Sequence, residues 1–252
     1  MCQVMVGLVH AATLFPGSEL SFSGASFEYT RVRFASATGE SGADASLNGN
    51  ALTVSFGGFG GSAAPAPFSS DYGTGFIGLR IHAIESFIAD LNIVAQGTYA
   101  VEAPVSGSWA SVFGSIPFSM QVLGVNGVPY TATDLSRSFS LSLNPSSVSI
   151  QNPNGAVNQS GQAIPASGNW MAQWSLAGLA STLAQVFQLG TGQNITELDV
   201  ALSPDISTAA GGNGAGTVTM GQVQFAPTPE PTSLTLIGMA GWAWLAYRRR
   251  KR

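Results

Sequence analysis

Short runs in which apolar and polar residues alternate recur along most of this chain. Each run is bounded by Gly, Asn, Pro or Ser, and we expect strands at residues 19–26, 29–35, 51–56, 118–122, 139–143, 148–150, 198–202 and 217–225. Alternation with a period of two is typical of strands that bury one face and expose the other. Because no regular alternation of strands and helices suggests a parallel sheet, the pattern predicts an all-β body, an antiparallel β-sandwich or a jelly roll.

Two segments depart from this simple pattern. Residues 76–101 fit either a strand or a helix, and we favour strands because apolar residues alternate at its start. At most one short helix is expected, where Leu176, Leu179, Leu183 and Phe187 share a helical face, with Ser175 as its cap and Gly190 at its end. Segments rich in Gly, Pro and Ser predict long loops at residues 57–75, 151–169 and 205–216. None of these loops divides the body, so residues 13–226 are expected to form one domain.

The C-terminal tail, residues 227–252, contains three chemically different segments in immediate succession. The first is rich in proline and includes Pro229, Glu230 and Pro231; since proline fixes φ and lacks a donor, residues 227–231 should be extended, solvated and open to a processing enzyme. The second, residues 233–247, is free of charge and apolar on every side, as a transmembrane helix is. The third is a basic cluster of Arg248, Arg249, Arg250, Lys251 and Arg252.

The apolar segment is short for a membrane span. At about 1.5 Å per residue it reaches roughly 21–24 Å, less than the ~30 Å of a hydrocarbon core. Trp242, Trp244 and Tyr247 lie near the basic end, where interfacial aromatic residues belong. The positive-inside rule then holds residues 248–252 in the cytoplasm and places the body outside.

This order of segments closely resembles the PEP-CTERM sorting signal. The resemblance rests on Pro229-Glu230-Pro231, the short apolar helix and the terminal basic cluster, and it covers residues 227–252 only. It implies recognition by an exosortase, a membrane transpeptidase of bacteria that make exopolysaccharide, with cleavage near the Pro-Glu-Pro and transfer of the body to the surface or matrix. The alternative is a plain C-terminal anchor that is never processed.

An exported protein needs an N-terminal signal, and residues 1–12 look like the remnant of one. An apolar fragment leads to the small residues Ala11 and Ala12, but no basic region precedes it, so we expect the true start to lie upstream. Cleavage there would remove Cys2, the one cysteine of the chain, and the mature protein would have no disulfide.

Charge is scarce and unevenly placed. Only 9% of the residues are charged, and residues 1–228 contain four arginines against twelve acidic residues, a net charge of −8. A body this acidic lacks the electrostatic footprint of a nucleic-acid binder.

A search of the sequence for catalytic chemistry finds nothing specific. His82 is the only histidine after residue 12, and no Gly-x-Ser-x-Gly motif accompanies it. We therefore expect no catalytic residues, no cofactor and no metal built from Cys and His. Whether calcium binds stays open. A glycosidase needs two facing carboxylates, which the sequence alone cannot pair.

Aromatic residues give the one binding hypothesis. Trp170 and Trp174 lie four residues apart and would face one side of a strand, and Trp109 lies near a predicted loop. Such residues are most often core, although exposed aromatic rings also stack on sugars. Three function classes follow: a structural protein of the surface or exopolysaccharide matrix, which we favour, then a carbohydrate-binding module, then an extracellular hydrolase with an unrecognised site.

Overall fold

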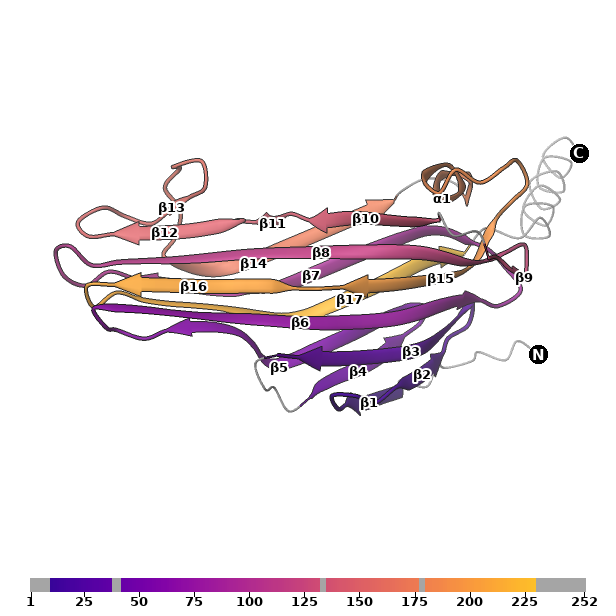
Figure 1. The fold of residues 1–252 in the computed structure, drawn as a ribbon, viewed down its shortest axis with the longest axis horizontal. Coiled ribbons are helices and arrows are strands. Elements are labelled where there is room, and N and C mark those ends of the chain that lie inside the picture. Colours follow the sequence, from indigo (N-terminus) through magenta and orange to yellow (C-terminus); the bar gives the residue numbers. More distant parts are fainter. Residues whose placement is uncertain (1–9, 38–41, 132–134, 177–179, 230–252) are drawn as a thin grey trace, which may run out of the picture.

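The fold is all-β and antiparallel, as the alternating pattern predicts. The computed structural model describes residues 10–37, 42–131, 135–176 and 180–229, and within them the chain forms seventeen strands and one helix. The longest strands run along the longest axis of the molecule (Figure 1), and they form two sheets. Seven of the eight strand runs expected from the sequence fall within or largely on observed strands, and the run at residues 19–26 does so only over residues 20–23.

The first sheet has seven strands. From one edge to the other it contains β1 (His10–Leu14), β4 (Ala43–Asn48), β5 (Ala51–Ala63), β17 (Ala215–Pro229), β7 (Ile88–Glu102), β14 (Ser167–Leu176) and β11 (Leu143–Asn144). The last long strand of the described chain, β17, therefore lies in the middle of this sheet, with β5 on one side and β7 on the other.

The second sheet has ten strands. Its main path is β13 (Val157–Asn158), β12 (Ser147–Gln151), β8 (Trp109–Val125), β15 (Ile195–Leu202), β6 (Phe68–Ala83), β3 (Phe27–Ser36) and β2 (Leu20–Ser23). β9 (Val128–Pro129) and β10 (Ser136–Leu141) pair with β8, while β16 (Asp205–Gly211) continues the line of β15 between β6 and β8. β6 and β7 confirm the prediction of strands over residues 76–101.

The two sheets pack face to face around one apolar core. β16 contacts β5 and β17, and β8 contacts β7 and β17, so the layers meet along the centre of both sheets. The inward side chains are apolar and fully buried, for example Phe27, Ile81, Leu91, Val223 and Phe225. Burial of alternating side chains from two facing sheets is the packing of a β-sandwich.

The prediction of long loops at residues 57–75 and 205–216 is wrong over most of both segments. β5 continues to Ala63, β6 begins at Phe68, and β16 occupies residues 205–211. Glycine is needed here because the backbones approach closely: a Cβ on Gly60 would lie 2.0 Å from the Val218 carbonyl oxygen, and one on Gly73 would lie 2.8 Å from that of Gly60. The glycines thus mark close approach within strands rather than turns.

The short helix is present, but its bounds differ from the prediction. It is α1 (Ala180–Val186), and it buries Leu183 together with the following Phe187. Ser175 and Leu176 belong instead to β14, where the hydrogen-bond ladder with β7 continues to Leu176 opposite Leu91. The residue with positive φ after the helix is Gln188, at 57°, and not Gly190.

Two expectations concern the ends of the chain. His10–Leu14 pairs with Ala43–Leu47 as the edge strand β1, so cleavage after Ala12 would remove most of that strand. At the other end, the expected membrane helix at residues 233–247 lies outside the described residues. Among the described residues, no helix has the length and apolar character needed to cross a membrane.

Candidate functional site

The sorting motif begins inside the fold. β17 ends at Pro229, which pairs with Ile88 of β7, whereas Glu230 and Pro231 lie outside the described residues, as do residues 248–252. The extended conformation expected for the proline segment is confirmed over residues 227–229. The expected solvation is wrong for Pro227, which is buried opposite Leu91.

Proline is tolerated here because only one side of the strand is paired. The ladder between β17 and β5 ends at Phe225 opposite Leu52, while the ladder with β7 continues to Pro229. A proline lacks the N–H of a ladder bond, so it is confined to strand positions with an unpaired side. The body therefore passes into the sorting motif with no linker between them.

A charged surface lies on the outer face of the ten-stranded sheet, around β3, β6 and β15. Arg80 is central: its Nε and Nη2 donate to the two Asp199 carboxylate oxygens at 2.8 and 3.1 Å, and its Nη1 lies 3.3 Å from Glu197 Oε1. The hydrogen bonds to Asp199 are the main cause that raises the pKa of Arg80. Glu197 and Asp199 are thus held by one shared cation.

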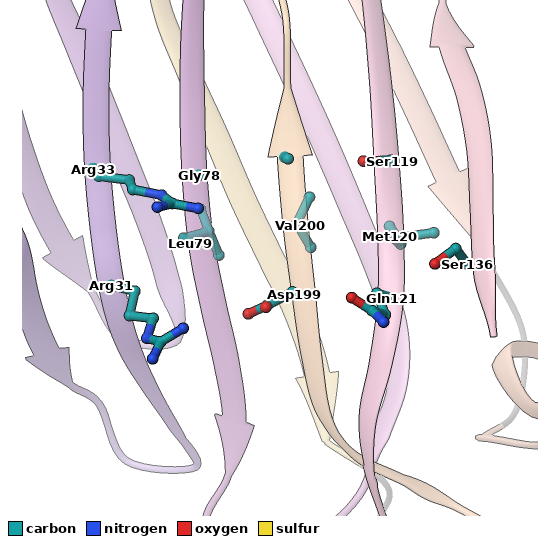
Figure 2. Close-up of a pocket in the computed structure, with 11 residues that line it drawn as sticks. Arg31, Arg33, Gly78, Leu79, Ser119, Met120, Gln121, Ser136, Asp199 and Val200 are labelled. Atoms are coloured by element: carbon teal, nitrogen blue, oxygen red, sulfur yellow. The ribbon is translucent and has the colours of Figure 1, made fainter. Parts of the chain in front are cut away.

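A shallow pocket of about 200 Å³ is lined by Asp199, the partner of Arg80 (Figure 2). Arg31 and Arg33 project into it from β3, while Asp199, Gln121 and Ser136 line it from β15, β8 and β10. Among the described residues neither Arg31 nor Arg33 is ion-paired with a carboxylate; the Arg33 guanidinium lies over the Phe76 ring at 5.1 Å. The pocket presents two guanidinium groups to solvent.

A β-bulge in β3 puts Arg31 in this position. The pairing of β3 with β6 shifts between Thr30 and Arg33, and Arg31 has a φ of 52°. The extra residue lets Tyr29 and Val32 both point into the core, and the left-handed conformation at Arg31 turns its side chain outward.

The three tryptophans expected as glycan contacts do not share one surface. Trp170 and Trp174 face the same side of β14, as the spacing predicts, but that side is the inward one. Trp170 is 2% exposed, lies against Gly97 and donates its indole N–H to the Thr219 carbonyl at 3.0 Å. Trp174 is half-buried and packs against Phe118 and Phe139. Trp109, on β8, belongs to the outer face of the other sheet.

Sequence reasoning missed the charged surface, since it could not pair β3, β6 and β15. Plain alternation over residues 29–35 would put Tyr29 on the same side as Arg31 and Arg33, and the bulge in β3 prevents this. Within the described part of the chain, no group of three or more His, Cys, Asp and Glu side chains gathers where a metal ion could be held. At the pocket, the Asp199 carboxylate accepts two hydrogen bonds from Arg80.

The structure thus defines an antiparallel β-sandwich whose central strand leads into a C-terminal signal. The family model described as the PEP-CTERM protein-sorting motif matches residues 227–251, so the chain carries this sorting motif. The motif implies export, sorting at the membrane and recognition by an exosortase.

Other comparisons add little. No curated protein matches the chain. Among solved structures, a family 12 xyloglucanase from Bacillus licheniformis in complex with ligand is 9% identical, with 87% of this chain and 100% of that chain covered and a TM-score of 0.20. The structure of the infectious bursal disease virus Gt strain is 10% identical, with coverage of 75% and 52% and a TM-score of 0.11. Both TM-scores are too low to indicate a shared fold.

Proposed function

We propose that this protein is a structural component of the bacterial cell surface or exopolysaccharide matrix, delivered there by an exosortase and without catalytic activity. The single observation that carries the proposal is the place of β17: it is central in its sheet and continues without a linker into the sorting motif. Any attachment at the processed C-terminus would therefore be connected to the body through β17.

This connection suits a protein that must resist pulling. β17 pairs with β7 from Ala215 to Pro229 and with β5 from Gly216 to Phe225. Antiparallel hydrogen bonds lie perpendicular to the strands, so a force along β17 acts across two ladders at once and loads many bonds together. The inward residues of the same strand, such as Val223 and Phe225, also anchor it in the core.

The acidic residues support a non-enzymatic role for the body. Glu197 and Asp199, two carboxylates of the pocket region, lie on the same strand and share Arg80. A hydrolase of the two-carboxylate kind needs one group on each side of the scissile bond.

A single-molecule pulling experiment tests the proposal. In the body freed of residues 230–252, force is applied between Pro229 and a Cys introduced as Ser106→Cys, which lies just beyond the opposite end of β7, so the β7–β17 ladder is sheared. The matched control pulls between Pro229 and Glu85→Cys, beside Ile88, so the same ladder is unzipped bond by bond. We expect a several-fold higher unfolding force in shear; equal, low forces in both directions would contradict a role in bearing tension.

A further inference from the structure

Four aromatic side chains gather on the outer face of the ten-stranded sheet, where β16 lies between β6 and β8. The register places Tyr72, Ser207 and Phe113 in one row across these strands. Four residues further along each strand, Phe68, Gly211 and Trp109 form a second row. We name Phe68, Tyr72, Trp109 and Phe113 the aromatic platform.

The platform is open to solvent. Phe68 is 65% exposed, Tyr72 60% and Phe113 50%, while Trp109 is half-buried. Their neighbours along the strands, Val112 and Ala110 on β8, point inward and are buried, so the four rings are on the side of the sheet that faces away from the core. Large apolar side chains grouped on such a face are typical of an interaction site.

At one end of the platform the aromatic rings pack against each other and against the sheet. The Phe68 and Trp109 rings lie 6.3 Å apart between centroids. The indole also covers Gly211: a Cβ there would lie 2.5 Å from Nε1 of Trp109. A glycine at this position therefore lets the indole lie close to the strand.

The side chains between the two aromatic rows are small and mostly polar. The row between them consists of Ser70, Ala209 and Ser111, and β12 adds Ser147, Ser149 and Gln151 beside these rows. Hydroxyl and amide groups can both donate and accept hydrogen bonds. No charged side chain belongs to these rows among the described residues, although the body as a whole is acidic.

We propose that the aromatic platform binds a neutral polysaccharide chain. Its rings offer flat apolar faces for the faces of sugar rings, and the serines and Gln151 offer partners for sugar hydroxyls. An uncharged ligand matches rows that carry no charge. This binding role goes beyond the structural role proposed above, since a protein can bear tension without any glycan contact.

The size of the platform favours a glycan over a second protein. Three strand spacings from β6 to β12 and four residues along a strand give about 14 by 13 Å, or roughly 200 Å². Stable protein interfaces bury about 800 Å² on each partner. A second copy of this chain would find too little surface here, whereas a few sugar rings cover it.

The test uses the full-length protein in a detergent that contains no sugar, on a printed array of neutral and acidic polysaccharides. We expect binding to at least one neutral polymer. The double variant Tyr72→Ala with Phe113→Ala should weaken that binding at least tenfold, while Tyr72→Phe should keep it, because the ring and not the hydroxyl makes the contact. Phe15→Ala is the matched control: Phe15 is 59% exposed but lies outside the platform, and its removal should leave binding unchanged.

Several results would overturn the proposal. These are no binding to any polymer, binding to acidic polymers only, or full binding by the double variant with an unchanged thermal melt. Analytical sedimentation of the wild type and the double variant tests whether a second copy of this chain, and not a glycan, covers the platform. Self-association of the wild type that the double substitution abolishes would assign the platform to contacts between copies instead.

Discussion

One tyrosine connects the two sheets through the core. Tyr29, on β3 of the ten-stranded sheet, is fully buried, and its hydroxyl donates to the carbonyl of Asn50, at the turn before β5 of the other sheet. The Phe225 carbonyl of β17 lies 3.4 Å from the same hydroxyl. The bulge at Arg31 allows Tyr29 and Val32 to point inward together, so a local irregularity of β3 fixes this contact.

Tyr29→Phe should lower the free energy of unfolding by about 1–2 kcal/mol, because it leaves the partly buried Asn50 carbonyl without the tyrosine donor. Urea unfolding followed by circular dichroism measures the change. Tyr72→Phe is the matched control and should have no effect on stability, since Tyr72 is exposed. Equal stability of Tyr29→Phe and wild type would show that the hydroxyl contributes nothing.

The same variant has a distinctive response to alkali. Burial raises the pKa of Tyr29 above its ordinary value of about 10. The folded state therefore keeps a proton that the unfolded state loses, so stability is complete below pH 10 and falls as the pH rises above it. Tyr29→Phe has no group that titrates here, so this part of the loss of stability above pH 10 should disappear. A variant that only loosened the packing would keep it.

Among the elements, β17 does the most to connect fold and sorting. It supplies Val218, Met220, Val223 and Phe225 to the core and pairs with strands on both sides. A register shift after Met220, at the exposed Gly221, keeps the inward side chains on the core face along the whole strand. Without the C-terminal half of β17, the seven-stranded sheet would have a gap between β5 and β7.

A body ending at Pro229 should fold alone, and one ending at Gly221 should not. The shorter chain loses Val223 and Phe225, each worth roughly 1.5–3 kcal/mol of apolar burial, together with the ladder bonds on both sides. Against a typical total of about 5–15 kcal/mol, this loss is decisive. Circular dichroism should show a cooperative thermal melt, unchanged by reductant, for residues 10–229 only. A similar melt of residues 10–221 would contradict the role given to β17.

The sequence predicts strands well where large apolar residues alternate, as in β3 and β15. It fails where the alternating residues are small. Gly60 and Gly73 are in strands because the two sheets approach there, and nothing local distinguishes this from a turn. The aromatic platform was predicted only in part for the same reason: Trp109 was a candidate glycan contact, but Phe68 and Tyr72 lie in a segment that was expected to be a loop.

The spacing of Trp170 and Trp174 also shows the limit of a period of two. Alternation gives residues a common side, and the structure confirms it. Alternation does not predict which face of the strand is buried. That depends on β8 and β10 of the other sheet, which are distant in sequence. Prediction of the charged surface likewise requires the pairing of distant strands, because Arg80 and Asp199 are 119 residues apart in sequence.

At the scale of the whole molecule, a β-sandwich body is joined to a C-terminal sorting signal. The body has few charges, and its described residues 10–229 contain no cysteine, so its stability rests on packing between the sheets. The sorting motif starts at the last residue of β17, which leaves a processing enzyme no spacer between the folded sheet and Glu230.

The most direct test is the C-terminus of the protein in an exosortase-bearing host. Replacing Glu230 and Pro231 with Ala leaves Pro229 and the β17 ladder intact, and Thr228→Ala, at an exposed neighbouring position, is the control. We predict that wild type and Thr228→Ala yield a shortened body whose new C-terminus mass spectrometry places near residue 230, while the double variant accumulates at full length in the membrane fraction. Persistence of all three proteins at full length would mean that the tail is only an anchor, and would contradict sorting by an exosortase.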